Sequence, residues 1–190
     1  MFEILQSYYD KSSLITIFVL SILSIYFIIT FWIFLYKYFL LNRLIAIEEY
    51  SLKKLFHGRI KRVDEKSIMF SYINRVLVPN RAIFMVAKES AIKIATAGLT
   101  ALSIIASTAP FIGLFGTVIS ILETFSKLGT KGGSNISTIA PAISEALIAT
   151  ASGIFVAIFA YSFHLILKRK AYELSVLLDN QADLILAQKG

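Results

Sequence analysis

Residues 13–36 read SLITIFVLSILSIYFIITFWIFLY and contain no charged side chain. A helix of about 20 apolar residues crosses the hydrocarbon core of a bilayer, whereas the core of a signal peptide has only about 7–15. We therefore expect a retained membrane helix over residues 13–38. The composition agrees, because 57% of the 190 residues are hydrophobic and 16% are charged, against about 25% charged in soluble domains.

Two further apolar stretches predict a second membrane helix at residues 94–126 and a third at 137–167. The helical pattern of the second runs without interruption from Arg81 to Ser126, and that of the third continues into the tail. One such helix would be about twice as long as the bilayer is thick, at about 1.5 Å per residue. We expect an all-α membrane protein with three transmembrane helices, two of them long and extending into the cytoplasm.

Basic residues indicate the orientation. Lys37 and Arg43 follow the first span, and Lys168 to Lys170 follow the third; Lys and Arg concentrate on the cytoplasmic side of membrane helices. The remaining segments are then predicted as a short periplasmic N-terminus (1–12), a basic helical cytoplasmic segment (39–93), a periplasmic loop (127–136) and a cytoplasmic helical tail (168–190). Asn80 is predicted to cap the helix that begins at Arg81.

Composition and motifs argue against several classes of function. The net charge of +7 arises in the segments that flank the apolar runs, so nucleic-acid binding is not expected. The chain has no cysteine, which removes disulfides and thiolate metal sites. It also shows no phosphate-binding glycine loop, paired metal ligands or nucleophile elbow. We expect no cofactor, no metal and no enzymatic activity.

Small residues recur every three or four positions on the second and third spans. The stripes are Ala106, Ala109, Gly113, Gly116 and Ser120, and Ala142, Ala146, Ala149, Gly153, Ala157 and Ala160. Small side chains let helices approach closely in lipid, so these two spans are expected to pack tightly. Pro110 lacks a backbone N–H and predicts a kink above Ala106.

Three polar residues interrupt these spans. Glu145 is the one acidic residue within 137–167, and an acidic group at membrane depth usually marks a pathway; alternatively it lies at the outer interface. Thr117 and Thr150 could match in depth, or could each bond a carbonyl of their own helix. Because Thr150 lies about 140° around the helix from Glu145, the two line one cavity only if that cavity is wide or bounded by several helices.

Residues 109–118 (APFIGLFGTV) and 140–151 (APAISEALIATA) closely resemble the TolQ/ExbB proton-channel family. One departure is Ser144 with Ile143 before Glu145, where many relatives carry Gly-Ile or Gly-Val. The resemblance implies a bacterial inner-membrane motor in which a pentamer of this chain encloses two partner subunits of the TolR/ExbD type. An aspartate of the partner would carry the proton, while Thr117, Thr150 and Glu145 of this chain would line the pathway.

The resemblance also implies a downstream protein of the TolA/TonB type. The short N-terminus and the end soon after the third helix favour a TolQ-like member, acting in cell-envelope integrity and division, over an ExbB-like member that energises outer-membrane transport. The alternative from another class is a membrane scaffold that conducts no protons. Surface or packing roles are expected for the isolated His57 and His164.

Overall fold

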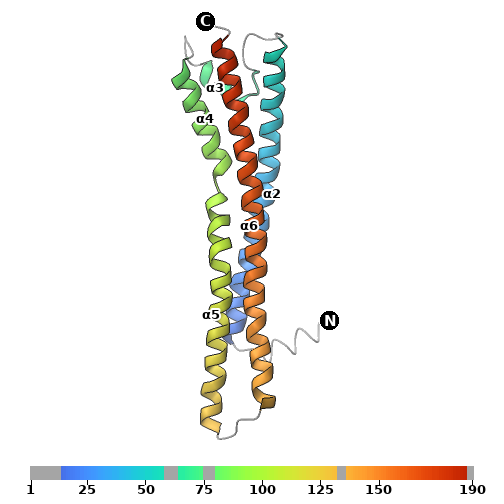
Figure 1. The fold of residues 1–190 in the computed structure, drawn as a ribbon, viewed down its shortest axis with the longest axis vertical. Helices are drawn as coiled ribbons and strands as arrows, with labels where there is room; N and C mark the ends of the chain where they lie inside the picture. Colours follow the sequence, from blue (N-terminus) through green and yellow to red (C-terminus); the bar gives the residue numbers. More distant parts are fainter. Residues whose placement is uncertain (1–13, 58–63, 75–79, 132–135, 188–190) are drawn as a thin grey trace. The chain divides into compact units, whose positions relative to one another are not determined.

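The computed structural model describes residues 14–57, 64–74, 80–131 and 136–187. Five helices account for nearly all of them (Figure 1): α2 (Leu14–Phe56), α3 (Ile68–Ile73), α4 (Arg81–Thr96), α5 (Leu99–Lys131) and α6 (Ile136–Ala187). Within the described chain, three stretches are long and apolar enough to cross a membrane: Ile15–Phe56, Arg81–Ser126 and Ile139–Ala187. The predicted all-α fold with three membrane helices is confirmed.

The chain divides into two compact units. The first unit contains the described parts of residues 1–32 and 101–163, and the second unit contains those of 33–100 and 164–190. Helices α2 and α6 contribute residues to both units. The first unit holds most of the apolar membrane segments, and the second holds most of the basic residues.

The core of the first unit combines small residues with a few branched ones. Its buried members are Val19 and Leu23 of α2, Ile105 and Ala109 of α5, and Ala149, Val156, Ala157 and Ala160 of α6. Because alanine leaves room for a neighbouring backbone, this composition lets the helices lie close together. The buried alanines belong to the two stripes seen in the sequence.

Aromatic rings fill the contact between α2 and α6 in the first unit. Phe31 of α2 lies edge-on to Phe163 at 5.1 Å between ring centroids and packs against Phe159 at 5.7 Å. One turn earlier, Phe27 contacts Phe155 and Phe159, each at 5.8 Å. Such tilted and edge-to-face pairs each add about 0.5–1.5 kcal/mol beyond the area that they bury. The four-residue spacing on both helices aligns the rings in one row.

A buried carboxylate organises the second unit. Glu48 of α2 is fully buried and accepts hydrogen bonds from the Ser67 hydroxyl (2.7 Å), the Ile68 N–H (2.8 Å) and the Gln181 side chain (2.9 Å). Ser67 is the N-cap of α3 and accepts from the Met69 N–H. One side chain of α2 thereby holds the start of α3 and a residue of α6.

The prediction of one uninterrupted helix from Arg81 to Ser126 is wrong. Helix α4 ends at Thr96 and α5 begins at Leu99 (Figure 1). Between them Gly98 has φ 89°, a left-handed conformation that costs other residues about 1–2 kcal/mol. The hydrophobic pattern continues through this glycine, which is why helical periodicity alone does not reveal the break.

Two side chains bind backbone carbonyls beside the break. The buried Lys37 ammonium donates to the Ile94 carbonyl of α4 at 2.9 Å, where a cation complements the carboxyl end of a helix. The His164 ring nitrogen Nδ1 lies 3.0 Å from the Leu99 carbonyl. Since a carbonyl only accepts, Nδ1 carries the proton. His164 thereby joins α6 to the first residue of α5.

Other helix boundaries differ slightly from the predictions. Helix α5 continues to Lys131 and α6 begins at Ile136, so helix covers part of the predicted loop 127–136; residues 132–135 lie outside the described chain, as does the predicted N-terminal segment 1–12. Helix α2 passes through residue 38 without interruption. The predicted cap is confirmed, because the Asn80 side chain accepts from the Ile83 N–H at 3.1 Å.

Candidate functional site

Helices α5 and α6 approach each other backbone to backbone. A Cβ atom added to Gly153 would lie 2.5 Å from the Ala109 carbonyl oxygen, and one added to Gly113 would lie 2.6 Å from the Ala149 carbonyl oxygen. Real Cβ atoms essentially never come this close to backbone. Glycine is therefore required at both positions, and the helices are in direct contact over this stretch.

Gly116 occupies the next turn of the same stripe but has a different neighbour. A Cβ there would meet the Val19 side chain of α2 at 3.0 Å and the Ala149 side chain at 3.3 Å. The Val19 methyl groups belong to a side chain and can shift by a few tenths of an ångström, whereas the Ala149 Cβ is fixed by its backbone but lies only about 0.1 Å inside ordinary contact. The stripe of α5 therefore serves two contacts, with α6 at Gly113 and with both α2 and α6 at Gly116.

The close approach brings two hydroxyl groups together. Thr117 Oγ1 lies 2.5 Å from Thr150 Oγ1 and 3.1 Å from the Gly113 carbonyl oxygen. Thr117 is buried, with 7% of its surface exposed, and Thr150 is half-buried. We call Thr117 and Thr150 the threonine pair. The two residues suggested by the sequence are thus neighbours across the α5–α6 contact.

The donors in the threonine pair follow from its two contacts. Each hydroxyl has one proton and two acceptor positions. The Gly113 carbonyl only accepts, so Thr117 donates to it. The proton in the 2.5 Å contact is then that of Thr150. Thr150 gives away its proton and keeps acceptor capacity on its own oxygen.

Glu145 lies apart from the threonine pair on α6. It is half-buried and precedes Thr150 by five residues, which places it about 140° around the helix at about 100° per residue. The two residues therefore occupy different faces of α6. The structure brings Thr117 to Thr150, and Glu145 retains its separate place in the first unit.

Pro110 lies inside α5, one turn before Gly113. Because proline has no N–H, it cannot donate the helical bond to the Ala106 carbonyl. Ala106 and Pro110 are both half-buried. The kink expected here stays a prediction.

Several buried polar residues, Thr16 of α2 among them, escaped the sequence analysis. Glu48 and Gln181 form the network of the second unit, and the Thr30 hydroxyl of α2 is buried with no hydrogen-bond partner among the described residues. Glu48 follows an apolar helical stretch, and its neighbour Glu49 is exposed. Counting helical faces could have separated the two glutamates. Nothing in the sequence distinguishes Thr30 from the other hydroxyls of that helix.

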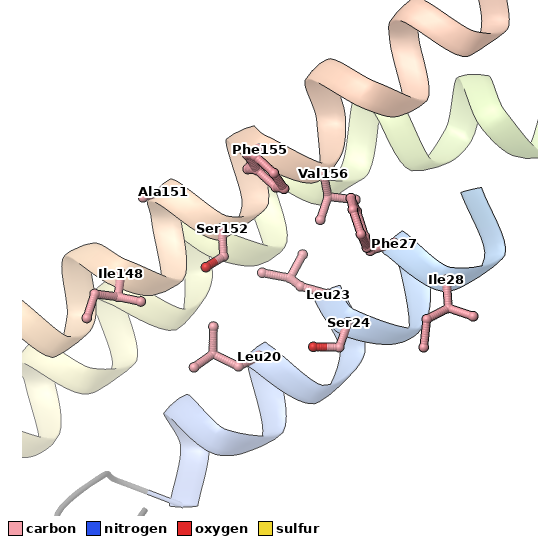
Figure 2. Close-up of a pocket in the computed structure, with 10 residues that line it drawn as sticks. All are labelled: Leu20, Leu23, Ser24, Phe27, Ile28, Ile148, Ala151, Ser152, Phe155 and Val156. Carbon is pink, nitrogen blue, oxygen red and sulfur yellow. The ribbon is translucent and has the colours of Figure 1, made fainter. Parts of the chain in front are cut away.

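An apolar groove of about 540 Å³ runs between α2 and α6 in the first unit. Figure 2 shows side chains from both helices along it, with Leu20, Leu23 and Phe27 on α2 facing Ile148 and Phe155 on α6. Among the described residues that line it, the polar side chains are those of Ser24 and Ser152. Such a surface suits hydrocarbon, from lipid or from another helix.

This chain is similar in sequence to known membrane proteins. Residues 79–180 match the MotA/TolQ/ExbB proton channel family. The chain is 44% identical to "Putative biopolymer transport protein ExbB-like 1" of Helicobacter pylori (strain J99 / ATCC 700824) over 199 residues, which cover 100% of both chains. It is 52% identical over 69 residues to "Biopolymer transport protein ExbB" of Neisseria gonorrhoeae, covering 35% of this chain and 31% of that protein. It is 50% identical over 62 residues to "Tol-Pal system protein TolQ" of Pseudomonas aeruginosa, covering 33% and 27%.

Proposed function

Because the chain belongs to the MotA/TolQ/ExbB proton channel family, we propose that it is the channel subunit of a bacterial inner-membrane motor driven by the proton-motive force. The observation that carries this proposal is the threonine pair, a hydroxyl–hydroxyl bond across the backbone-to-backbone contact of α5 and α6. The pair lies within the segment that matches the family. A polar contact at this depth is costly unless it serves a polar ligand or is fully paired.

The direction of the hydrogen bonds in the threonine pair determines whether a partner's carboxyl group can bind there in its protonated or its ionised form. Thr150 presents an acceptor, since its proton is used toward Thr117. A protonated carboxylic acid can donate to that oxygen, whereas a carboxylate cannot. The partner is a TolR/ExbD-like single-span subunit, two copies of which supply an aspartate. The pair would stabilise that aspartate in its neutral form while it passes through the membrane.

Assembly into a ring follows from surfaces that one chain leaves open. The apolar groove (Figure 2) is open, and aromatic residues of the membrane segments, such as Phe111 at 70% and Phe115 at 60%, are left exposed by the described residues. We propose five copies around two partner helices. Glu145, on a separate face of α6 from the threonine pair, then lines a different part of the same interior.

Two energised processes are candidates. The ExbB-like process, which acts through a TonB-like protein on outer-membrane transport, is favoured by the full-length relatives named ExbB-like. The TolQ-like process, which acts through a TolA-like protein on the Tol-Pal system, is supported by the similarity to the relative named TolQ. A strain lacking the gene separates them. Loss of TonB-dependent uptake with intact detergent resistance supports the former, and the reverse supports the latter.

Proton flux tests the site. Thr117→Val and Thr150→Val each remove a hydroxyl with little change in size, so ring formation measured by native mass spectrometry should stay intact. Partner-dependent proton flux into liposomes should fall at least tenfold. Thr108→Val is the matched control, because the Thr108 hydroxyl bonds only the Ile104 carbonyl of its own helix. Equal flux in all three variants and the wild type would remove the threonine pair from the mechanism.

Topology is tested by labelling. With the N-terminus in the periplasm and the C-terminus in the cytoplasm, cysteines introduced at positions 57 and 131 should react from opposite sides of the membrane. Reaction of both from one side would contradict the proposed orientation. The cysteine-free chain makes the experiment direct.

A further inference from the structure

A polar pocket of about 660 Å³ lies on the second unit, at the side of α2. Its lining residues are Arg43, Ala46, Ile47 and Tyr50 from α2, and Asp64 and Lys66 from the segment before α3. The four residues of α2 follow the i, i+3, i+4, i+7 spacing of a single helix face. The pocket is within the usual range of ligand sites, about 300–1,000 Å³.

The acidic side chain of this pocket is already paired with a cation, whereas two of its basic side chains are not paired with an anion among the described residues. Asp64 is fully engaged: one oxygen accepts from the Lys54 ammonium at 2.7 Å, and the other accepts from the Lys66 N–H at 3.2 Å. These two hydrogen bonds hold the pKa of Asp64 below its usual range, so it is a carboxylate already paired with a cation. By contrast, the side chains of Arg43 and Lys66 have no ion pair or hydrogen bond with any described residue.

The position of the pocket along α2 suggests where a ligand comes from. Arg43 lies five residues beyond residue 38, the predicted end of the first span, or about 7.5 Å along the helix. The polar headgroup layer extends about 5–8 Å beyond the hydrocarbon core on each side. Tyr50 adds an aromatic ring with a polar tip, and the Lys54 ammonium lies over that ring at 4.4 Å.

We propose that Arg43, Tyr50 and Lys66 form a binding site for the phosphate of an anionic phospholipid. The Arg43 guanidinium can hold two phosphate oxygens with its planar fork, and Lys66 adds a second positive charge. Ala46 and Ile47 give the glycerol an apolar surface. With Lys54 included, three cations surround one carboxylate, so the pocket favours an anionic headgroup over a zwitterionic one.

Native mass spectrometry of the purified, assembled chain tests this site with phosphatidylglycerol and phosphatidylcholine in detergent. The wild-type chain should retain phosphatidylglycerol preferentially. Each basic residue at a membrane surface contributes about fivefold to the binding of anionic lipid, so Arg43→Gln with Lys66→Gln should weaken retention by about 25-fold. Arg43→Lys keeps the charge but loses the planar fork, and should weaken retention by less than the fivefold that loss of the charge itself would cause.

The matched control is Lys168→Gln with Arg169→Gln. Both residues are exposed, follow the third span and lie outside the pocket. Their substitution removes the same amount of positive charge as the pocket variant does. Control retention close to that of the wild type supports the site. An equal loss in the two double variants would overturn it, because the effect would then be general electrostatic attraction. If Arg43→Gln with Lys66→Gln fails to fold, the retention of phosphatidylglycerol by Arg43→Lys is compared with that of the control instead.

A competition experiment with inorganic phosphate distinguishes a lipid headgroup from free phosphate as the ligand of this pocket. Inorganic phosphate at tens of millimolar should not displace bound phosphatidylglycerol, because it lacks the glycerol and acyl contacts. Displacement at that concentration, or equal retention of phosphatidylcholine by the wild-type chain, would overturn the assignment to an anionic lipid.

Discussion

Replacing Gly153 by alanine should separate α5 from α6. The new Cβ would lie 2.5 Å from the Ala109 carbonyl oxygen and 3.2 Å from the Gly113 Cα. The first distance is about 0.9 Å inside the 3.4 Å at which ordinary contact begins. Both neighbours are backbone atoms of α5, so no side chain can turn away, and the helices themselves must move.

The cost can be worked out from these contacts. Overpacking of this kind typically costs about 1–3 kcal/mol. A displacement of about 0.9 Å would also stretch the 2.5 Å contact of the threonine pair toward the limit of a hydrogen bond, a loss of about 1 kcal/mol. Alanine regains about 1 kcal/mol through its higher helix propensity. The net loss of unfolding free energy is therefore about 1–3 kcal/mol.

The assay is reversible unfolding of the purified chain in mixed micelles, with Gly116→Ala as the matched control. At Gly116 the added Cβ meets the Val19 side chain at 3.0 Å, which can yield, so the helix-propensity gain should leave stability near the wild-type value. Gly113→Ala should behave like Gly153→Ala. If Gly116→Ala destabilised the chain as much as Gly153→Ala, the reasoning from backbone contact would be refuted.

Three further predictions concern the second unit. Glu48→Ala leaves buried donors without a partner and should lower the unfolding free energy by about 3 kcal/mol. Glu49→Ala, at the exposed neighbouring residue, should change it by less than about 0.5 kcal/mol. Chemical unfolding of the two variants measures both free energies. Gly98→Ala places a Cβ at φ 89° and should cost about 1–2 kcal/mol by the same measurement. The ion pair of Asp64 stabilises the fold at pH values above the usual aspartate pKa of about 4, and this stabilisation is lost as the pH falls through the lowered pKa of Asp64 in the folded state. The unfolding free energy should therefore decrease less between pH 6 and pH 3 in Asp64→Asn than in the wild type. An equal decrease in both proteins would count against the ion pair.

The sequence was sufficient for the membrane helices and for the small-residue contact. Apolar runs determine the spans because lipid penalises exposed polar backbone, and stripes of glycine and alanine determine which faces can approach. Gly113 and Gly153 are predictable in this way. Their partners are backbone carbonyls, and the depth match between Thr117 and Thr150 needed only a residue count along each helix.

Other features depended on contacts that no local pattern contains. The break at Gly98 needs a left-handed residue, and glycine is tolerated in either conformation. Lys37 binds a carbonyl 57 residues away, and Glu48 is paired with a residue 133 positions away. Periodicity describes one helix at a time, so it could place these side chains on a face without naming the neighbour.

The order of donors in the threonine pair limits how a proton can travel. Relay along hydroxyl groups requires each oxygen to pass its proton to the next, and the last acceptor must be able to pass one on. Here the chain runs from Thr150 to Thr117 and ends on the Gly113 carbonyl, which has no proton to release. The pair alone therefore cannot pass a proton onward, and we expect this chain without its proposed partner to conduct no protons.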